Sequence, residues 1–230
     1  MNISGLQKMT LLDYPEKVAT TVFTGGCNFR CPFCHNASFV INPNNEGNIS
    51  EEAFFEFLIK RKGLLDGVCI SGGEPLLQKE ISGFIHKIKN MGFLVKLDTN
   101  GSFPDKLKEL LKDGLIDYVA MDIKNSPASY AKTAGTGEEI LPRIKESVGI
   151  LLKSNIDYEF RTTVVKDFHT KEDFIEIGKL IKGAKRYFLQ YFVDSGDLIQ
   201  PGLKSVEKSE MEAFADIVRG YVPEVGIRGV

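Results

Sequence analysis

Three cysteines, Cys27, Cys31 and Cys34, are spaced as C-x3-C-x2-C in residues 24–36, and this run constrains the chain more than any other feature. Thiolates this close together can converge on one metal centre. Three are one ligand short of closing a tetrahedral zinc site or a four-iron cluster, and an open position is typical of a catalytic metal. The fourth cysteine, Cys69, lies in an apolar stretch and is interpreted as a small core residue.

Composition and charge exclude several classes of protein. The chain has 230 residues, of which 43% are hydrophobic, so we expect a single domain over residues 1–230. The formal net charge is −2, without long runs of one sign, and this gives no indication of a nucleic-acid or membrane partner. Clustered cysteines without a signal-peptide pattern or a bilayer-length apolar stretch favour the cytoplasm.

Hydrophobic periodicity predicts six strand-helix pairs after an irregular lead-in at residues 1–17, where Tyr14-Pro15 disfavours helix. The predicted strands cover residues 18–24, 67–71, 93–98, 118–123, 158–165 and 186–192. The predicted helices cover residues 51–62, 77–91, 105–112, 142–154, 172–182 and 206–221. This alternation indicates an α/β protein with a parallel sheet and helices outside it. Periodicity alone leaves open whether the sheet is doubly wound or curls toward a barrel.

Small and charged residues follow the second, third and fourth predicted strands, at the edge where parallel sheets bind ligands. These candidate residues are Gly72, Gly73, Glu74, Asp98, Thr99, Asn100, Asp122 and Lys124. Period-two alternation places Asp122 and Lys124 on one face, so we expect the two to pair. The alternative is an edge strand carrying two solvated charges.

Arg161 is the candidate catalytic residue of the fifth predicted strand. Its guanidinium suits bidentate recognition of a carboxylate in a ligand or in a substrate peptide. Glu159 lies on the same face of the strand, so a structural Arg161–Glu159 ion pair is the competing interpretation. We interpret His86, on a helix, and His169, in a loop, as surface residues.

The cysteine run resembles the signature C-x3-C-x-(aromatic)-C of the radical S-adenosylmethionine (SAM) enzymes, matched by Cys27, Cys31, Phe33 and Cys34. Residues 72–75, 98–101 and 122–124 resemble further motifs of that family and occur in the same order. The resemblance implies a partial (β/α)6 TIM-type barrel and a [4Fe-4S] cluster held by the three cysteines. It also implies that the amino and carboxylate groups of SAM chelate the fourth iron.

The resemblance also implies roles for the strand-end residues. Gly72, Gly73 and Glu74 would receive the methionine amino group, and Asp98, Thr99 and Asn100 would contact the nucleoside and help to hold a monovalent cation. Lys124, paired with Asp122, would serve the ligand carboxylate or ribose. Phe33, in the cysteine motif, is counted with these cofactor-binding residues.

Within this family, the Cys34-His-Asn36 ending and residues 11–15 are most similar to the activating proteins of anaerobic ribonucleoside-triphosphate reductases. That resemblance implies an electron from reduced flavodoxin or ferredoxin and cleavage of SAM to a 5′-deoxyadenosyl radical. The radical would then abstract hydrogen from a glycine of a partner glycyl-radical enzyme, with Arg161 steadying the partner loop.

Two other interpretations remain at this point. A small-molecule radical SAM enzyme, such as a 7-carboxy-7-deazaguanine synthase-like mutase, would use the same open barrel. A non-catalytic iron-sulfur or zinc binding protein would leave Gly72, Glu74, Asp98 and Lys124 without a purpose.

Overall fold

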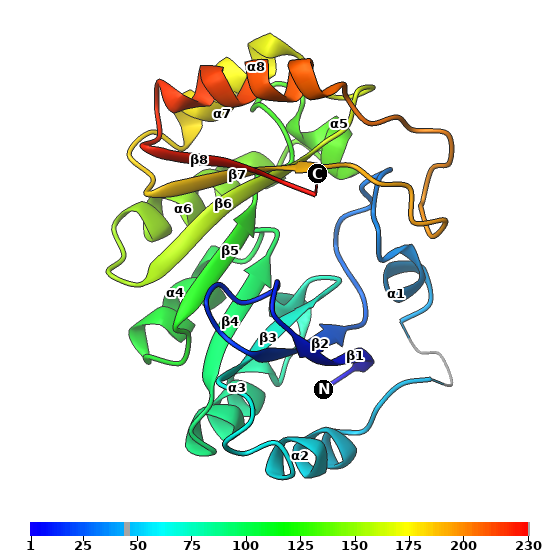
Figure 1. Cartoon of the computed structure of the whole chain (residues 1–230), viewed down its shortest axis with the longest axis vertical. Helices are drawn as coiled ribbons and strands as arrows, with labels where there is room; N and C mark the ends of the chain where they lie inside the picture. The colour runs from blue at the N-terminus through cyan, green and yellow to red at the C-terminus, as the bar shows by residue number, and fades with distance from the viewer. Residues whose placement is uncertain (44–46, 230) are drawn as a thin grey trace. The chain divides into compact units, whose positions relative to one another are not determined.

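The computed structural model describes residues 1–43 and 47–229. Its strands lie in one eight-stranded sheet in chain order, β1 to β8 (Figure 1). Strand β1 is antiparallel to β2, and the pairs β2/β3, β3/β4, β6/β7 and β7/β8 are parallel. These pairings confirm the predicted α/β class with a mostly parallel sheet.

The chain divides into two compact units. The first unit comprises Met1–Asn28, Ser38–Thr99 and Asp105–Val119, and the second comprises Phe29–Ala37, Asn100–Pro104 and Ala120–Val230. Three elements have residues in both units: α1 (Ala37–Ile41), α4 (Pro104–Lys112) and β5 (Tyr118–Asp122). The single-domain organisation expected from composition stays a prediction.

The first unit is a small sheet with its connecting helices. Its elements are β1 (Ile3–Thr10), β2 (Ala19–Thr24), α2 (Glu51–Ile59), β3 (Gly67–Gly72), the 3-10 turn η1 (Pro75–Leu77), α3 (Ile81–Asn90) and β4 (Leu94–Thr99). Ser50 caps α2 by accepting a hydrogen bond from the Ala53 N–H at 3.1 Å. Helix α3 buries Ile81, Phe84, Ile85 and Ile88, a stripe with helical spacing that packs into the core.

The second unit continues the alternation. Its elements are α5 (Tyr130–Ala134), α6 (Ile140–Leu152), β6 (Asp157–Val164), α7 (Lys171–Leu180), β7 (Arg186–Tyr191), α8 (Lys208–Arg219) and β8 (Glu224–Arg228). Helices α7 and α8 run side by side near β7 and β8 (Figure 1), where Phe174 and Phe214 stack with ring centroids 4.4 Å apart. Within residues 1–43 and 47–229, no helix has the length and apolar character needed to cross a bilayer.

The prediction of an irregular lead-in at residues 1–17 is wrong for residues 3–10, which form β1. Its pairing with β2 is interrupted by register shifts, and three consecutive residues, Gln7, Lys8 and Met9, are exposed, so the segment lacks the alternation that indicates a strand. The expected helix at residues 77–91 begins only at Ile81, because the preceding residues form η1. Strand β8 and helix α5, each of five residues, were not expected from the sequence.

Candidate functional site

The glycine turn after β3 is held against the chain's own backbone. Gly72 has φ +112°, and a Cβ there would lie 2.3 Å from the Thr24 nitrogen, while a Cβ on Gly73 would lie 2.0 Å from the Gly26 oxygen. The Gly73 N–H donates to the Thr24 oxygen and the Glu74 N–H donates to the Gly26 oxygen, each at 2.9 Å. Both glycines are therefore required by this backbone approach.

This contact fixes the beginning of the cysteine loop. A Cβ built on Gly73 would also lie 3.3 Å from the Cys27 Cβ, so the turn supports the residue that carries the first thiol. Any side chain at position 73 is expected to displace Cys27 as well as change the turn. In addition to its predicted role in ligand binding, this turn therefore positions Cys27.

Glu74 is fully buried, and its carboxylate faces inward. One oxygen accepts hydrogen bonds from the Leu76 N–H at 3.0 Å and from the Thr99 hydroxyl at 2.8 Å. These contacts cap η1 and tie it to the end of β4. The Glu74 carboxylate therefore braces the turn, and the backbone around it is the part that the resemblance assigns to a ligand.

Asp98 forms an ion pair with Lys96, which is not among the residues predicted from the sequence. Lys96 is only 2% exposed, and the Ser71 hydroxyl donates to the other carboxylate oxygen of Asp98 at 3.0 Å. The signal for this pair was available in the sequence, because residues 96 and 98 share one face of a strand. The monovalent cation expected near residues 98–100 stays a prediction.

Asn100 belongs to the second unit and stabilises the turn after β4. Its side-chain oxygen accepts from the Ser102 N–H at 2.9 Å and from the Ser102 hydroxyl at 2.5 Å. Gly101 follows with φ +77°, and a Cβ there would collide with Met121 at 2.1 Å. The local turn accounts for these residue types, and contact of Asn100 with a nucleoside stays a prediction.

Asp122 in the second unit holds two cations. Its carboxylate accepts from Arg161 Nε at 2.5 Å and from Lys124 Nζ at 2.8 Å. Burial opposes the charged form of Asp122, but the Arg161 guanidinium and the Lys124 ammonium outweigh burial and hold the pKa of Asp122 well below its usual range. Burial likewise opposes the charged form of Lys124, yet the Asp122 carboxylate raises the pKa of Lys124.

The predicted pairing of Asp122 with Lys124 is confirmed, and the alternative of two solvated charges is wrong. Glu159 accepts from Arg228 at 2.7 and 2.8 Å, and the Arg228 guanidinium stacks on Phe188, 3.5 Å from the ring centroid. The competing Arg161–Glu159 ion pair is thus replaced by an Arg161–Asp122 pair. Whether Arg161 also steadies a substrate loop stays a prediction.

The second unit also holds Cys31 and Cys34 in one turn, with the Cys34 N–H donating to the Cys31 oxygen at 3.0 Å. Burial raises the pKa of the Cys34 thiol, and the Asn36 N–H and then the Lys124 ammonium offset part of that rise. No disulfide joins Cys27, Cys31, Cys34 or Cys69. Reduced thiols next to a cation are a donor set that fits an iron-sulfur cluster.

The complete ligand set stays a prediction from the motif. Cys27 is described with the first unit, and Cys31 and Cys34 are described with the second. In the part of the chain that the structure describes, no three histidine, cysteine, aspartate or glutamate side chains are grouped as a metal site. Cys69 is fully buried in β3, as its apolar neighbours predicted.

The interpretation of His169 as a surface residue is wrong. It is 3% exposed, with Nε2 2.9 Å from the Lys124 oxygen and Nδ1 accepting from the Val165 N–H at 3.1 Å. Because the Lys124 carbonyl oxygen can only accept, Nε2 carries a proton and donates to it; Nδ1 also lies 3.2 Å from the Val165 oxygen. Phe33 is also buried, and its ring lies 5.9 Å from that of Phe168 and 6.5 Å from that of His169.

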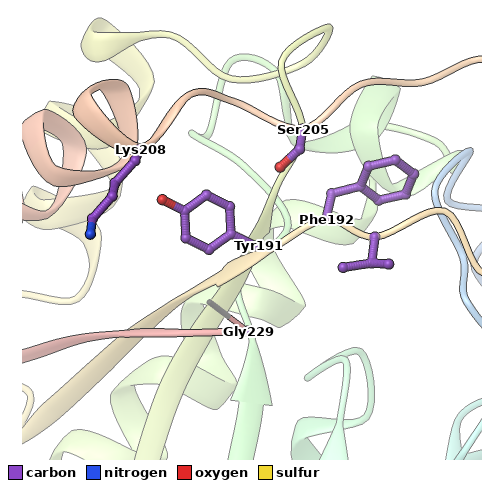
Figure 2. A pocket seen from close by; sticks show the side chains of 6 residues that line it. Tyr191, Phe192, Ser205, Lys208 and Gly229 are labelled. Carbon is purple, nitrogen blue, oxygen red and sulfur yellow. The ribbon is translucent and has the colours of Figure 1, made fainter.

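A pocket of about 310 Å³ lies beyond the ends of β7 and β8 in the second unit. Figure 2 shows the Tyr191 ring between Lys208 and Ser205 in this view. The lining residues are Tyr191, Phe192, Val193, Ser205, Lys208 and Gly229, and they include none of the predicted site residues.

Several known proteins are similar to this chain. The family model of the radical SAM superfamily matches residues 21–181. A protein of Methanocaldococcus jannaschii, provisionally named a glycyl-radical enzyme activating enzyme, is 35% identical over 99% of this chain and 96% of its own length. A pyruvate formate-lyase-activating enzyme of Clostridium pasteurianum is 35% identical over 54% of this chain and 52% of its own. A GTP 3′,8-cyclase of Nautilia profundicola is 29% identical over 80% of this chain and 58% of its own.

Solved structures show the fold. A domain of a pyruvate-formate lyase-activating enzyme from Bacteroides vulgatus matches 71% of this chain and 99% of that chain, with TM-score 0.55 and 14% identity. Streptococcus suis SuiB bound to its precursor peptide SuiA matches 91% of this chain and 48% of that chain, with TM-score 0.68 and 14% identity. The likeness confirms the expected fold class, a partial (β/α)6 TIM-type barrel.

Proposed function

The chain belongs to the radical SAM superfamily, and on that premise we propose that it is an activase that generates a glycyl radical on a partner enzyme. The observation that carries this proposal is the match to the Methanocaldococcus jannaschii relative, which spans nearly the full length of both chains. The shorter match to a pyruvate formate-lyase-activating enzyme supports the same class. Membership of this superfamily makes the chain an enzyme of radical chemistry.

The specific partner that we propose is an anaerobic ribonucleoside-triphosphate reductase. This choice depends on the Cys34-His-Asn36 ending and on residues 11–15, which resemble the activators of those reductases. Reduced flavodoxin or ferredoxin is the proposed electron donor, and the cytoplasm is the proposed compartment, consistent with the reduced thiols of the four cysteines.

The chain's own residues supply binding and orientation. Together, the cluster and SAM, when bound, supply a 5′-deoxyadenosyl radical that can take hydrogen from a glycine Cα. Cys27, Cys31 and Cys34 are the proposed cluster ligands. Lys124 would donate to the SAM carboxylate, and Asp98 would accept from the ribose hydroxyls.

Arg161 is the proposed contact to the glycine-bearing loop of the partner. Its Nε bonds to Asp122, so the guanidinium is oriented before any partner arrives. We assign this guanidinium to a backbone or carboxylate acceptor of the partner.

The test combines reduced, reconstituted protein with SAM and an anaerobic ribonucleotide reductase from the same source. A glycyl-radical doublet in the electron paramagnetic resonance spectrum is expected. The Arg161→Ala variant should lower the radical yield more than it lowers uncoupled SAM cleavage. Arg219→Ala is the matched control, because Arg219 pairs with Asp216 on the exposed face of α8, and its radical yield should equal that of the wild type.

A second candidate is a small-molecule radical SAM enzyme, which the match to a GTP 3′,8-cyclase favours. The chain spans about 58% of that relative's length. Incubation with GTP and with 6-carboxy-tetrahydropterin tests this candidate. Conversion of either small molecule, without a partner glycyl radical, would replace the activase proposal.

A further inference from the structure

Lys96 is a buried lysine on β4 that the proposed function does not yet use. Its side chain is 2% exposed and among the largest fully buried side chains of the described residues. Moving an ammonium out of water is costly unless a nearby group compensates the charge. A lysine in this position therefore needs a specific partner.

That partner is Asp98, two residues along the same face of the strand. Lys96 Nζ forms an ion pair with one Asp98 oxygen and lies 3.7 Å from Cys69 Sγ and 6.0 Å from the centre of the Tyr118 ring. The Ser71 hydroxyl donates to the second Asp98 oxygen at 3.0 Å. Both oxygens of Asp98 thus have a donor that fixes the carboxylate in place.

We propose that Lys96 is a positioning residue that supplies Asp98 with its counter-charge, so that SAM binding requires no dissolved monovalent cation. This inference rests on the proposed cofactor role of Asp98. It also replaces the monovalent cation that the family resemblance implied beside residues 98–100.

Electrostatics supports the replacement. An ammonium and a monovalent metal ion carry the same charge, and a carboxylate already paired with the first attracts the second weakly. The lysine is covalently attached and held by its strand, so its charge does not depend on the salt composition of the solution. Asp98 keeps lone pairs that can accept from a hydroxyl donor such as a ribose.

The test measures SAM affinity in tetramethylammonium buffer with and without potassium, sodium or ammonium ions. Wild-type protein should bind SAM with the same dissociation constant in every buffer, within about twofold. Lys96→Ala should bind about tenfold more weakly or worse in tetramethylammonium, and should regain affinity when a small cation enters the vacated space. Lys96→Met fills that space without charge, so it should weaken binding without rescue.

Lys89→Met is the matched control. Lys89 pairs with Asp117 at 2.7 Å in the same unit but at a partly exposed position. This variant should bind SAM like the wild type in every buffer. A second readout needs neither cluster nor SAM: small cations should raise the thermal midpoint of apo Lys96→Ala and leave that of apo wild type unchanged.

Results that would overturn only the role of Lys96 can be told apart from a result that would also remove the cofactor role of Asp98. A wild-type affinity that changes more than about tenfold with the cation, or Lys96 variants that bind like wild type, would overturn the inference alone. Wild-type titration needs no variant, so this arm remains if the substitutions prevent folding. If Asp98→Asn binds SAM normally, the cofactor role of Asp98 fails, and the inference fails with it.

Discussion

Two segments of the chain each carry an acid and a lysine two residues apart, but in opposite order. On β4, Lys96 precedes Asp98, whereas Asp122 at the end of β5 precedes Lys124. Both pairs form ion pairs. Lys96 and Asp98 share one face of β4, whereas Lys124 lies two residues beyond the end of β5. Ligands meet parallel strands at their carboxyl ends, so the later residue of each pair lies nearer the ligand edge. The first pair therefore offers an acceptor and the second a donor.

Burial separates the two pairs further. The Lys96 side chain is 2% exposed, whereas that of Lys124 is 17% exposed and shares Asp122 with Arg161. Asp122 with its two described cations carries a net positive charge, which favours an anionic ligand group. Each pair consists of one aspartate and one lysine. In the proposed SAM-binding roles, the order of these two residues along the chain decides whether a pair presents its carboxylate or its ammonium to the ligand.

The largest effect is expected from removing the acid that holds two cations. Asp122→Asn removes the carboxylate charge that Arg161 and Lys124 share, and should lower the free energy of unfolding by about 3–5 kcal/mol. Chemical denaturation under anaerobic conditions measures this loss. Adding Arg161→Met to Asp122→Asn should recover part of it.

The control for this prediction is Glu176→Gln, which breaks the exposed pair with Lys179. It should leave the unfolding midpoint nearly unchanged, because solvent screens such pairs. Equal losses in the two variants would mean that the Asp122 group is no more buried than a surface pair.

The next effect concerns which part of SAM each pair meets. Asp98→Asn should weaken binding of both SAM and 5′-methylthioadenosine by about ten- to hundredfold, because both ligands contain the ribose. Lys124→Met should weaken SAM by a similar factor but leave 5′-methylthioadenosine within about twofold, because that ligand has no carboxylate. Calorimetry on protein of equal iron content measures both. If Lys124→Met weakened the binding of both ligands equally, Lys124 would contact the ribose rather than the carboxylate.

A smaller effect should appear in the pH dependence of stability, through a histidine that contacts Lys124 of the second pair. His169 donates to the Lys124 oxygen, and burial lowers the pKa of His169. Below about pH 6.5 the unfolded chain therefore binds a proton at this residue that the folded chain does not, so stability falls with falling pH by up to about 1.4 kcal/mol per unit. His169→Gln should flatten this slope, whereas His86→Gln, at an exposed position, should not. An unchanged slope in His169→Gln would contradict the assignment.

The smallest effect is expected at the thiol beside the first pair. Cys69→Ala removes the sulfur that lies 3.7 Å from Lys96 Nζ, a weak acceptor that the ion pair with Asp98 makes dispensable. Iron content and SAM affinity should equal those of the wild type, whereas Cys31→Ala should fail to retain the cluster. Loss of iron in Cys69→Ala alone would overturn the ligand assignment.

The sequence allowed much of this to be predicted where the signal is local. Six predicted strands correspond to β2–β7, because their apolar runs and bounding turns are contained in each segment. The pairing of Asp122 with Lys124 followed from a two-residue period. The same period was present at Lys96 and Asp98, but a lysine in a strand suggests an exposed face unless its acid is considered with it.

Features that depend on distant residues could not be predicted in this way. Burial of His169 depends on Lys124, 45 residues earlier in the chain. Strand β1 depends on its pairing with β2 rather than on its own pattern. The bracing role of Glu74 required the position of Thr99, which only the fold brings to its carboxylate.

The backbone contact between the glycine turn and the cysteine loop has a kinetic consequence. The hydrogen bonds from Gly73 to Thr24 and from Glu74 to Gly26 involve main-chain atoms alone, so they form as the first unit folds. Cys27, a proposed cluster ligand, is then expected to be in place before iron and sulfide arrive. Loading at this residue becomes capture by a prepared ligand rather than folding around a metal, and its rate should follow the supply of iron and sulfide instead of the rate of chain folding.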